Sequence, residues 1–283
     1  MSRSEDEIYE TVIDIAQRDD NIRAVILNGS RVKPNSFDEN KLHDFDFIYV
    51  VEDVYAYIDA DSWYANFGEI LLMRYSEPFY QKNDFNTFTY HMQFKDFNRI
   101  DLTLTTADHL DDCIDLAYSK VLLDKDDAFE NYSYVDTSYY ETSSFSEAEL
   151  KVAINDFYWY STVVVKGIAR TEFPYAVHIK EHEMRDAYKV ILKERILLNS
   201  EKDAIDFGVS DKYLYHYLGR FNYDSYLRTF DNEGLHNLKE SLLSMLNHFK
   251  FMLSEIERQR ELDLDYEDYE DRAMKFLHYN LSY

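Results

Sequence analysis

The chain contains the segment Ala24-Val-Ile-Leu-Asn-Gly-Ser30 and, after a polar stretch, the segment Asp44-Phe-Asp-Phe-Ile-Tyr-Val-Val51. The apolar run at 24–27 is rich in branched side chains and leads into Asn28-Gly29, so it predicts a buried strand that enters a tight turn. Residues 44–51 predict a second strand. The polar residues 31–43 between them include Pro34 and predict a loop.

Asp44 and Asp46 are predicted to present two carboxylates side by side. Residues two apart on a strand point to the same face of a sheet, so Phe45 and Phe47 should point to the other face. Neighbouring carboxylates repel one another unless a cation lies between them. Mg²⁺ favours such oxygens and keeps sites for phosphate oxygens, so the pair predicts a magnesium site.

Asp101 is a third candidate metal ligand. It lies in Arg99-Ile-Asp-Leu-Thr-Leu-Thr105, whose alternation predicts a half-buried strand. If that strand neighbours the Asp44 strand, three carboxylates can bind two metal ions in the arrangement used for displacement at phosphorus. Gly29 lets the main chain approach phosphate, and Ser30 offers an amide and a hydroxyl.

Each of these signals is weak alone. With 55 Asp+Glu in the chain, chance Asp-x-Asp pairs are common, and we interpret Asp263-x-Asp265 and Glu267-Asp268 as a solvated face. The order of the elements favours a site, because a strand enters Gly-Ser, a polar loop follows, the next strand opens with Asp-x-Asp and a later strand carries one Asp.

The first half is predicted to be a mixed α/β unit. Ser4 and Glu7 form a capping box that starts a helix ending near 19–21. Further strands are expected at 69–74, 87–94 and 99–105, a short helix or turn at 61–67, and a helix at 107–123.

The second half is predicted to be an all-helical bundle. Residues 126–145 are polar without a helical stripe and predict a linker. A second capping box, Ser146 with Glu149, opens the helices, and apolar residues at 235–253 recur at helical spacing. The expected fold class is therefore α+β, with a mixed β-sheet and flanking helices over 1–135, followed by a helical domain over 145–283.

Composition limits the possible partners. The 283 residues include one cysteine, which excludes a disulfide framework and fits a reducing, cytoplasmic compartment. The net charge of −25 repels phosphate backbones, so no nucleic-acid duplex is expected as a partner, and it attracts divalent metals, polyamines and amino sugars. Solubility alone would explain this charge equally well. No apolar run approaches the roughly 20 residues of a membrane span.

In combination, the motifs resemble the aminoglycoside 6-adenylyltransferase (streptomycin adenylyltransferase) family of the DNA polymerase β-like nucleotidyltransferase superfamily. The resemblance covers nearly the whole chain. Its residues are Leu27-Asn-Gly-Ser-Arg31, Asp44-Phe-Asp-Phe-Ile-Tyr-Val-Val-Glu-Asp-Val54, Ile100-Asp-Leu-Thr-Leu104, Lys120-Val-Leu-Leu-Asp-Lys-Asp126, and Val164-Val-Lys-Gly-Ile-Ala-Arg170 with Glu172. The chain departs from the family's pattern at Asn28 (usually Glu), at His178-Ile179 (usually Asp-His) and at Gly208-Val209 (usually Gly-Lys).

The resemblance implies Mg²⁺-dependent transfer of AMP from ATP to a hydroxyl of an aminoglycoside such as streptomycin, with release of pyrophosphate. This modification would inactivate the antibiotic and so confer resistance. The first domain would be the nucleotidyltransferase catalytic domain and the second would bind substrate. The residues implied to be catalytic and to bind metal are Asp44, Asp46 and Asp101, with Asp101 or a nearby Glu as base. The residues implied to bind nucleotide are Gly29, Ser30, Arg31 and Lys166.

Alternatives stay open for the residues of the second half and for the acceptor. Asp156 and Glu172 either bind the ammonium groups of a small polycationic acceptor or belong to a solvated face, and Lys166 either reaches the triphosphate or is a surface lysine. The alternative functions are nucleotidyl transfer to another small-molecule, protein or RNA hydroxyl, and a catalytically silent binding protein of the same fold. The chain is expected to be a monomer or a homodimer.

Overall fold

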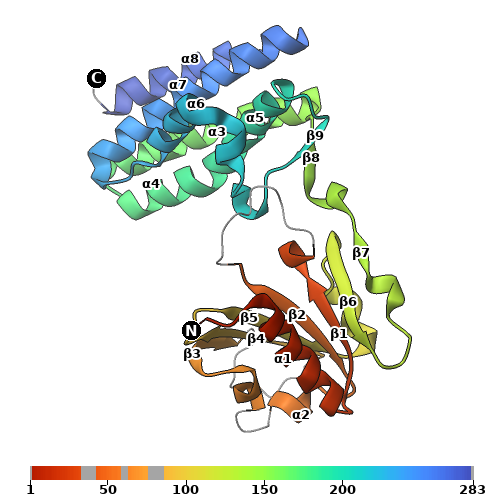
Figure 1. Cartoon of the computed structure of the whole chain (residues 1–283). Helices are drawn as coiled ribbons and strands as arrows, with labels where there is room; N and C mark the ends of the chain where they lie inside the picture. The colour runs from red at the N-terminus through yellow and green to blue at the C-terminus, as the bar shows by residue number, and fades with distance from the viewer. Residues whose placement is uncertain (1, 33–42, 59–62, 76–85, 282–283) are drawn as a thin grey trace. The chain divides into compact units, whose positions relative to one another are not determined.

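The computed structural model describes residues 2–32, 43–58, 63–75 and 86–281 (Figure 1). The chain divides into two compact units, Met1–Tyr139 and Tyr140–Tyr283. Their boundary falls within the stretch expected as a linker, 126–145. Most of the loop predicted at 31–43 lies outside the described residues, so that prediction stays open.

The first unit is built around a seven-stranded sheet with the spatial order β3-β4-β5-β2-β1-β6-β7. Strands β2 and β5 run parallel, and the other neighbouring strands run antiparallel. The strands expected at 24–27, 44–51, 69–74, 87–94 and 99–105 are confirmed. The bounds are β1 Ile22–Asn28, β2 Phe45–Val51, β3 Ile70–Tyr75, β4 Thr87–Phe94, β5 Arg99–Thr105, β6 Tyr118–Asp124 and β7 Tyr134–Val135.

Helix α1, Glu5–Arg18, covers one face of this sheet (Figure 1). The predicted capping box is present, since the Glu7 amide donates to Ser4 Oγ at 3.2 Å and the Ser4 amide donates to Glu7 Oε2 at 2.7 Å. The buried side of α1 packs against Phe45 and Phe47 of β2, in the main core of the unit. Alternation along β2 therefore directs Asp46 to the opposite face. The short elements α2, Tyr55–Ile58, and η2, Trp63–Phe67, follow β2.

The helix predicted at 107–123 is wrong. A 3₁₀ turn, η3, spans Ala107–Asp112, and residues 118–124 form strand β6, which pairs with β1 on the side away from β2. The apolar run at 121–123 is too short to distinguish a strand from a helix by spacing, and the free edge of β1 determines the outcome. The expected linker is also structured, because it contains the turns η4, Glu130–Tyr132, and η5, Thr137–Tyr140, and the strands β7 and β8, Glu141–Ser143.

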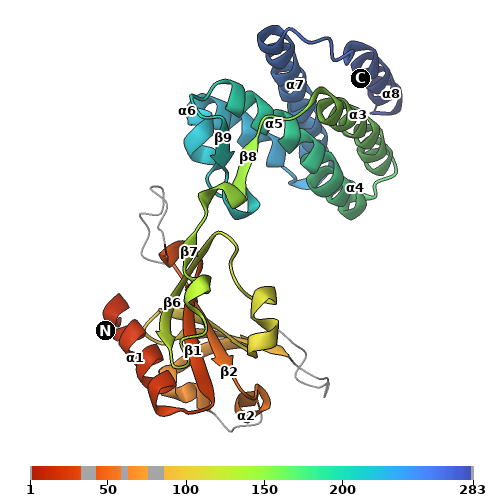
Figure 2. The same cartoon turned by 90° about the vertical axis from the view of Figure 1, so that its right-hand side faces the viewer.

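The second unit is mainly helical, as predicted (Figure 2). It also contains one element that was not expected: β9, Ala204–Asp206, pairs with β8 and buries Ile205. Three residues are too few to show a period, so this strand could not be predicted from spacing. The helical bounds are α3 Glu147–Ala169, α4 Phe173–Ile179, the π-helix η6 Lys180–Met184, α5 Arg185–Leu198, η7 Val209–Asp211, α6 Leu214–Leu227, η8 Arg228–Phe230, α7 Gly234–Arg260 and α8 Glu267–Leu281.

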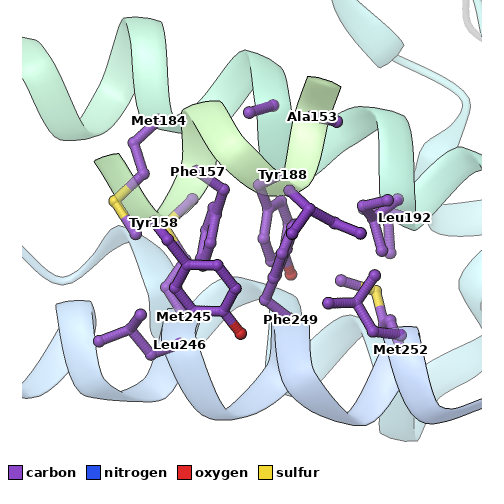
Figure 3. Close-up of a cluster of buried hydrophobic side chains, with 14 of the residues drawn as sticks. Ala153, Phe157, Tyr158, Met184, Tyr188, Leu192, Met245, Leu246, Phe249 and Met252 are labelled. Atoms are coloured by element: carbon purple, nitrogen blue, oxygen red, sulfur yellow. The ribbon is translucent and has the colours of Figure 1, made fainter. Parts of the chain in front are cut away.

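Aromatic stacking fixes the centre of the helical unit (Figure 3). Phe157 of α3 lies against Phe249 of α7 with ring centroids 3.6 Å apart and planes 12° apart. Tyr188 of α5 lies beside both rings, at 6.4 and 6.3 Å. The rings therefore join three helices, and the helical spacing predicted over 235–253 is confirmed by the buried side of α7. Within the described ranges, no helix is long and apolar enough to cross a membrane.

Candidate active site

A row of polar side chains crosses the sheet on the face opposite α1. The register places His91 of β4 opposite Asp101 of β5, Asp101 opposite Asp46 of β2, and Asp46 opposite Asn28 at the end of β1. These residues alternate with core residues along each strand, so their side chains share one face. The condition set for Asp101 is therefore met, because its strand is the direct parallel neighbour of the Asp46 strand.

Asp46 is the carboxylate with the least compensation in this row. Burial, followed by the charges of Asp101 and Asp44, raises the pKa of Asp46 from 3.8 to about 6. Burial also raises the pKa of Asp44. Among the described residues, Asp46 takes part in no ion pair, whereas Asp44 and Asp101 each do. Its buried negative charge therefore favours binding of a cation or a proton.

Arg99 bridges the other two aspartates. Its Nε and Nη2 donate to Asp101 at 2.8 and 2.7 Å, and Nη1 lies 3.2 Å from Asp44 Oδ2. His91 Nδ1 lies 2.9 Å from Asp101 Oδ2, within ion-pair distance but without forming a hydrogen bond. Sequence reasoning missed both basic residues. The available signal was their spacing, since Arg99 stands two residues before Asp101 and so points to the same face.

Gly29 lies against the Asp46 carboxylate. Its φ of +76° is in the region that favours glycine, and a Cβ at this position would lie 3.2 Å from Asp46 Oδ2 and 4.0 Å from Asp115 Oδ2. Ser30 follows in the 3₁₀ turn η1, Gly29–Arg31. Because Gly29 has no side chain, only main-chain atoms of the turn lie beside the half-buried carboxylate of Asp46. Asp115 is a further acidic residue of this region, and the sequence analysis did not single it out.

Asn28 and Arg31 hold the two ends of this turn. Asn28 Nδ2 donates to the Cys113 carbonyl at 3.0 Å, while its Oδ1 is buried without a hydrogen-bond partner among the described residues. Arg31 donates to the carbonyls of Asp44 and His43 at 2.9 and 2.7 Å, and its guanidinium lies 3.5 Å from the centroid of the Phe45 ring. Arg31 therefore fixes the approach of the chain to β2.

The donor atoms of this face suit a hard cation, although they do not form a completed cage. Carboxylate oxygens are the ligands that Mg²⁺ prefers, and Asp46 and Gly29 provide an uncompensated charge beside open main chain. In the described part of the chain, no group of three or more His, Cys, Asp or Glu side chains is arranged as a metal cluster. The Arg99 pairs are consistent with that finding, since the guanidinium engages two of the three aspartates.

The candidate residues of the second unit lie far apart along one helix. Asp156 is half-buried near the middle of α3, and Lys166 is exposed near its end, with Nζ 5.8 Å from the centroid of the Phe276 ring. Glu172 is exposed and lies beyond the end of α3. Roughly 20 Å of helix separates Asp156 from the last residue of α3, so Asp156 and Glu172 do not converge on one ammonium group.

Comparison with known proteins identifies the family. Residues 2–280 match the family described as streptomycin adenylyltransferase. Three proteins named aminoglycoside 6-adenylyltransferase are similar to the chain: one from Bacillus subtilis (strain 168), 28% identical over 97% of this chain and 96% of that protein; one from Staphylococcus aureus, 27% identical over 98% and 99%; and one from Campylobacter jejuni, 28% identical over 97% and 95%.

A crystal structure of an aminoglycoside 6-adenyltransferase from Bacillus subtilis is 24% identical, with a TM-score of 0.48 over 99% of this chain and 100% of that one. The match over residues 2–280 confirms both the family and the enzyme class that the motifs implied. The chain therefore belongs to the streptomycin adenylyltransferase family of nucleotidyltransferases.

Proposed function

We propose that this protein transfers AMP from ATP to a hydroxyl of an aminoglycoside such as streptomycin, releases pyrophosphate, and thereby inactivates the antibiotic. The observation that carries the proposal is the pairing of Asp46 with Asp101 on adjacent parallel strands, with the Gly29 turn against Asp46. Membership of the streptomycin adenylyltransferase family supports the same chemistry. We place this activity in the cytoplasm, where ATP is available.

Asp44, Asp46 and Asp101 are the residues that would hold Mg²⁺. Bound there, Mg²⁺ would neutralise phosphate charge and lower the pKa of the acceptor hydroxyl. To make room for it, Arg99 would have to release at least one of its two carboxylates, because it engages both Asp44 and Asp101 in this structure. The released guanidinium would then be a positive charge close to the bound phosphates.

The chain's own groups would orient the two substrates. The Gly29-Ser30 main chain would approach the phosphates, because no side chain at Gly29 obstructs them and amides are good anion donors. Asp101 would accept the proton of the acceptor hydroxyl, and Lys166 would contribute charge for the leaving pyrophosphate. Arg31 was predicted to bind nucleotide; we assign it a positioning role, because its guanidinium donates to two carbonyls next to β2.

The acidity of the chain supports a polycationic acceptor. With a net charge of −25, the protein attracts amine-bearing sugars over distances of about a Debye length, ~8 Å at physiological salt. Asp156 and Glu172 remain candidates for contacts with the ammonium groups. Because Asp156 and Glu172 lie far apart, they would have to contact different amines, or only one of them would contact the acceptor.

The test is a panel of acceptors incubated with Mg²⁺ and ATP. Streptomycin, other aminoglycosides and neutral polyols are offered in parallel, and mass spectrometry detects an added adenylyl group while a coupled assay measures pyrophosphate. We expect a product with at least one aminoglycoside and no product with Asp46→Asn. Modification of a polyol but of no aminoglycoside would refute the acceptor, and equal turnover by Asp46→Asn would refute the site.

A further inference from the structure

We propose that His91 of β4 positions Asp101 for catalysis by taking over its carboxylate when Arg99 releases it. The inference rests on the proposed function, in which Asp101 accepts the proton of the acceptor hydroxyl and Arg99 releases a carboxylate. His91 acts through Asp101 and is therefore a positioning residue. The three side chains belong to the first unit and to the adjacent strands β4 and β5.

The register of the sheet brings His91 to Asp101. The two residues lie directly opposite one another on β4 and β5. Tyr90 and Met92, on either side of His91, are buried in the main core, so the His91 side chain points to the face of the aspartates. His91 Nδ1 is buried there and lies 2.9 Å from Asp101 Oδ2. The position of the ring is therefore fixed by two paired strands.

His91 differs from its neighbours on this face because its hydrogen bond is not made. Among the described residues, Nδ1 has no hydrogen-bond partner, although 2.9 Å is an ordinary distance for such a bond. The direction of approach, and not the distance, therefore prevents the bond. Both neighbours on the same face of β4, Thr89 and Gln93, form a hydrogen bond of 2.9 Å. A buried nitrogen without a partner costs free energy, so His91 favours any rotation of Asp101 that completes the bond.

Arg99 sets the direction in which Asp101 faces. Its Nε and Nη2 donate to Oδ1 and Oδ2 of Asp101 at 2.8 and 2.7 Å, and such a two-pronged contact fixes the plane of a carboxylate. The torsion that turns an aspartate carboxylate is soft, so Asp101 can face His91 once this contact is broken. The side chain of Arg99 is 40% exposed and that of His91 is 21% exposed. Arg99 is thus the partner that can leave for phosphate, and His91 is the partner that stays.

A carboxylate that is held in one orientation is a better proton acceptor than one that rotates freely. A general base must lie within hydrogen-bond reach of the proton that it takes, and a small misplacement of a reacting group costs rate. When the Nδ1–H group of His91 donates to one oxygen of Asp101, the other oxygen keeps a defined direction. Without His91, Asp101 would lose its orientation in the same step in which Arg99 leaves.

A double-mutant cycle on the full chain tests the exchange of partners in the absence of nucleotide and metal. His91→Leu and His91→Asn are made in the wild type and in Arg99→Gln, and urea unfolding is measured in EDTA. With Arg99 in place, both changes should move the urea midpoint little. In Arg99→Gln, His91→Leu should lower the midpoint, and His91→Asn, which keeps a donor on a short side chain, should lower it less. The matched control Thr89→Val removes the hydrogen bond to Thr103 from the same face of β4, and its effect should be equal in both backgrounds.

An equal effect of His91→Leu in both backgrounds would overturn the inference, because His91 would then contribute nothing when Arg99 is absent. If Arg99→Gln does not fold, Arg99→Lys replaces it in the cycle. Lys keeps the positive charge but lacks the planar fork that holds both oxygens of Asp101.

Kinetics separate a positioning role from a structural one. With an acceptor that the wild type modifies, we expect His91→Leu to lower kcat about 10-fold with an unchanged KM for ATP, and His91→Asn to retain most of the activity. A wild-type kcat in His91→Leu, or an equal loss in His91→Asn, would overturn the positioning role. Absence of product from the wild type with every acceptor would refute the proposed function, whereas the urea cycle would still decide whether His91 replaces Arg99.

Discussion

Replacing Asp46 by Asn should stabilise the metal-free protein at neutral pH. Burial and the charges of Asp101 and Asp44 raise the pKa of Asp46 from 3.8 to about 6. Keeping this carboxylate ionised in the folded state at pH 7.5 therefore costs about 3 kcal/mol relative to the unfolded chain. Asn has nearly the same shape and no charge, and Asp46 takes part in no ion pair among the described residues, so the change should recover about 1–3 kcal/mol.

The pH dependence gives the sign of the effect independently. Because the folded pKa of Asp46 lies above its unfolded pKa, the wild type loses stability as the pH rises from about 4 through about 6. The Asp46→Asn variant should not show this loss of stability with rising pH. Urea unfolding in EDTA should therefore show the full advantage of Asp46→Asn at pH 7.5 and roughly half of it at pH 5.

Asp101→Asn is the matched control, because it makes the same chemical change on the adjacent strand. Asp101 binds Arg99 through two hydrogen bonds and lies 2.9 Å from His91 Nδ1. Its loss should destabilise the protein by about 1–3 kcal/mol, opposite in sign to Asp46→Asn. Two results would refute the view that Asp46 carries an uncompensated charge. One is that Asp46→Asn destabilises the protein, and the other is that the difference in stability between variant and wild type is the same at both pH values.

Two glycines give further predictions. Gly29→Val should lower the thermal midpoint and weaken ATP binding more than Gly29→Ala, because the φ of Gly29 is +76° and a Cβ there would lie 3.2 Å from Asp46 Oδ2. Calorimetry measures the thermal midpoint, and titration with ATP measures the affinity. Tight ATP binding by the Val variant would place the triphosphate elsewhere. Gly167→Ala should destabilise the helical unit by about 1–3 kcal/mol although Ala favours helices, because its Cβ would lie 2.8 Å from Ala176 Cβ of α4; an unchanged urea midpoint would show that α3 and α4 separate easily.

The local part of the fold and site was predictable because it depends on alternation. In β5 core residues alternate with polar ones around Asp101, and in β2 the core residues Phe45 and Phe47 flank Asp46, so the alternation of side chains along a strand assigns each aspartate to one face. The capping boxes at Ser4 and Ser146 likewise mark the starts of α1 and α3, because both require a hydroxyl and a carboxylate three residues apart.

The tertiary part was not predictable from spacing. Residues 118–124 became β6 because β1 offers an edge, and β9 exists because β8 lies beside it. Whether Asp101 would meet Asp46 depended on the sheet order, in which β5 is the parallel neighbour of β2 although β3 and β4 come between them in sequence. No periodicity within a strand encodes its neighbour.

Arg99 explains how three acidic residues persist on one partly buried face. Clustered carboxylates are costly without a cation, and a guanidinium that pairs with Asp44 and Asp101 offsets part of that cost. In the described part of the chain Asp46 forms no ion pair, and burial together with Asp101 and Asp44 raises its pKa to about 6 although the charge of Arg99 lowers it. A divalent cation entering the face therefore gains most at Asp46, and it competes with Arg99 for the other two carboxylates. The Arg99 pairs would thus limit the affinity of this face for metal, and a triphosphate that draws Arg99 away would strengthen metal binding in turn.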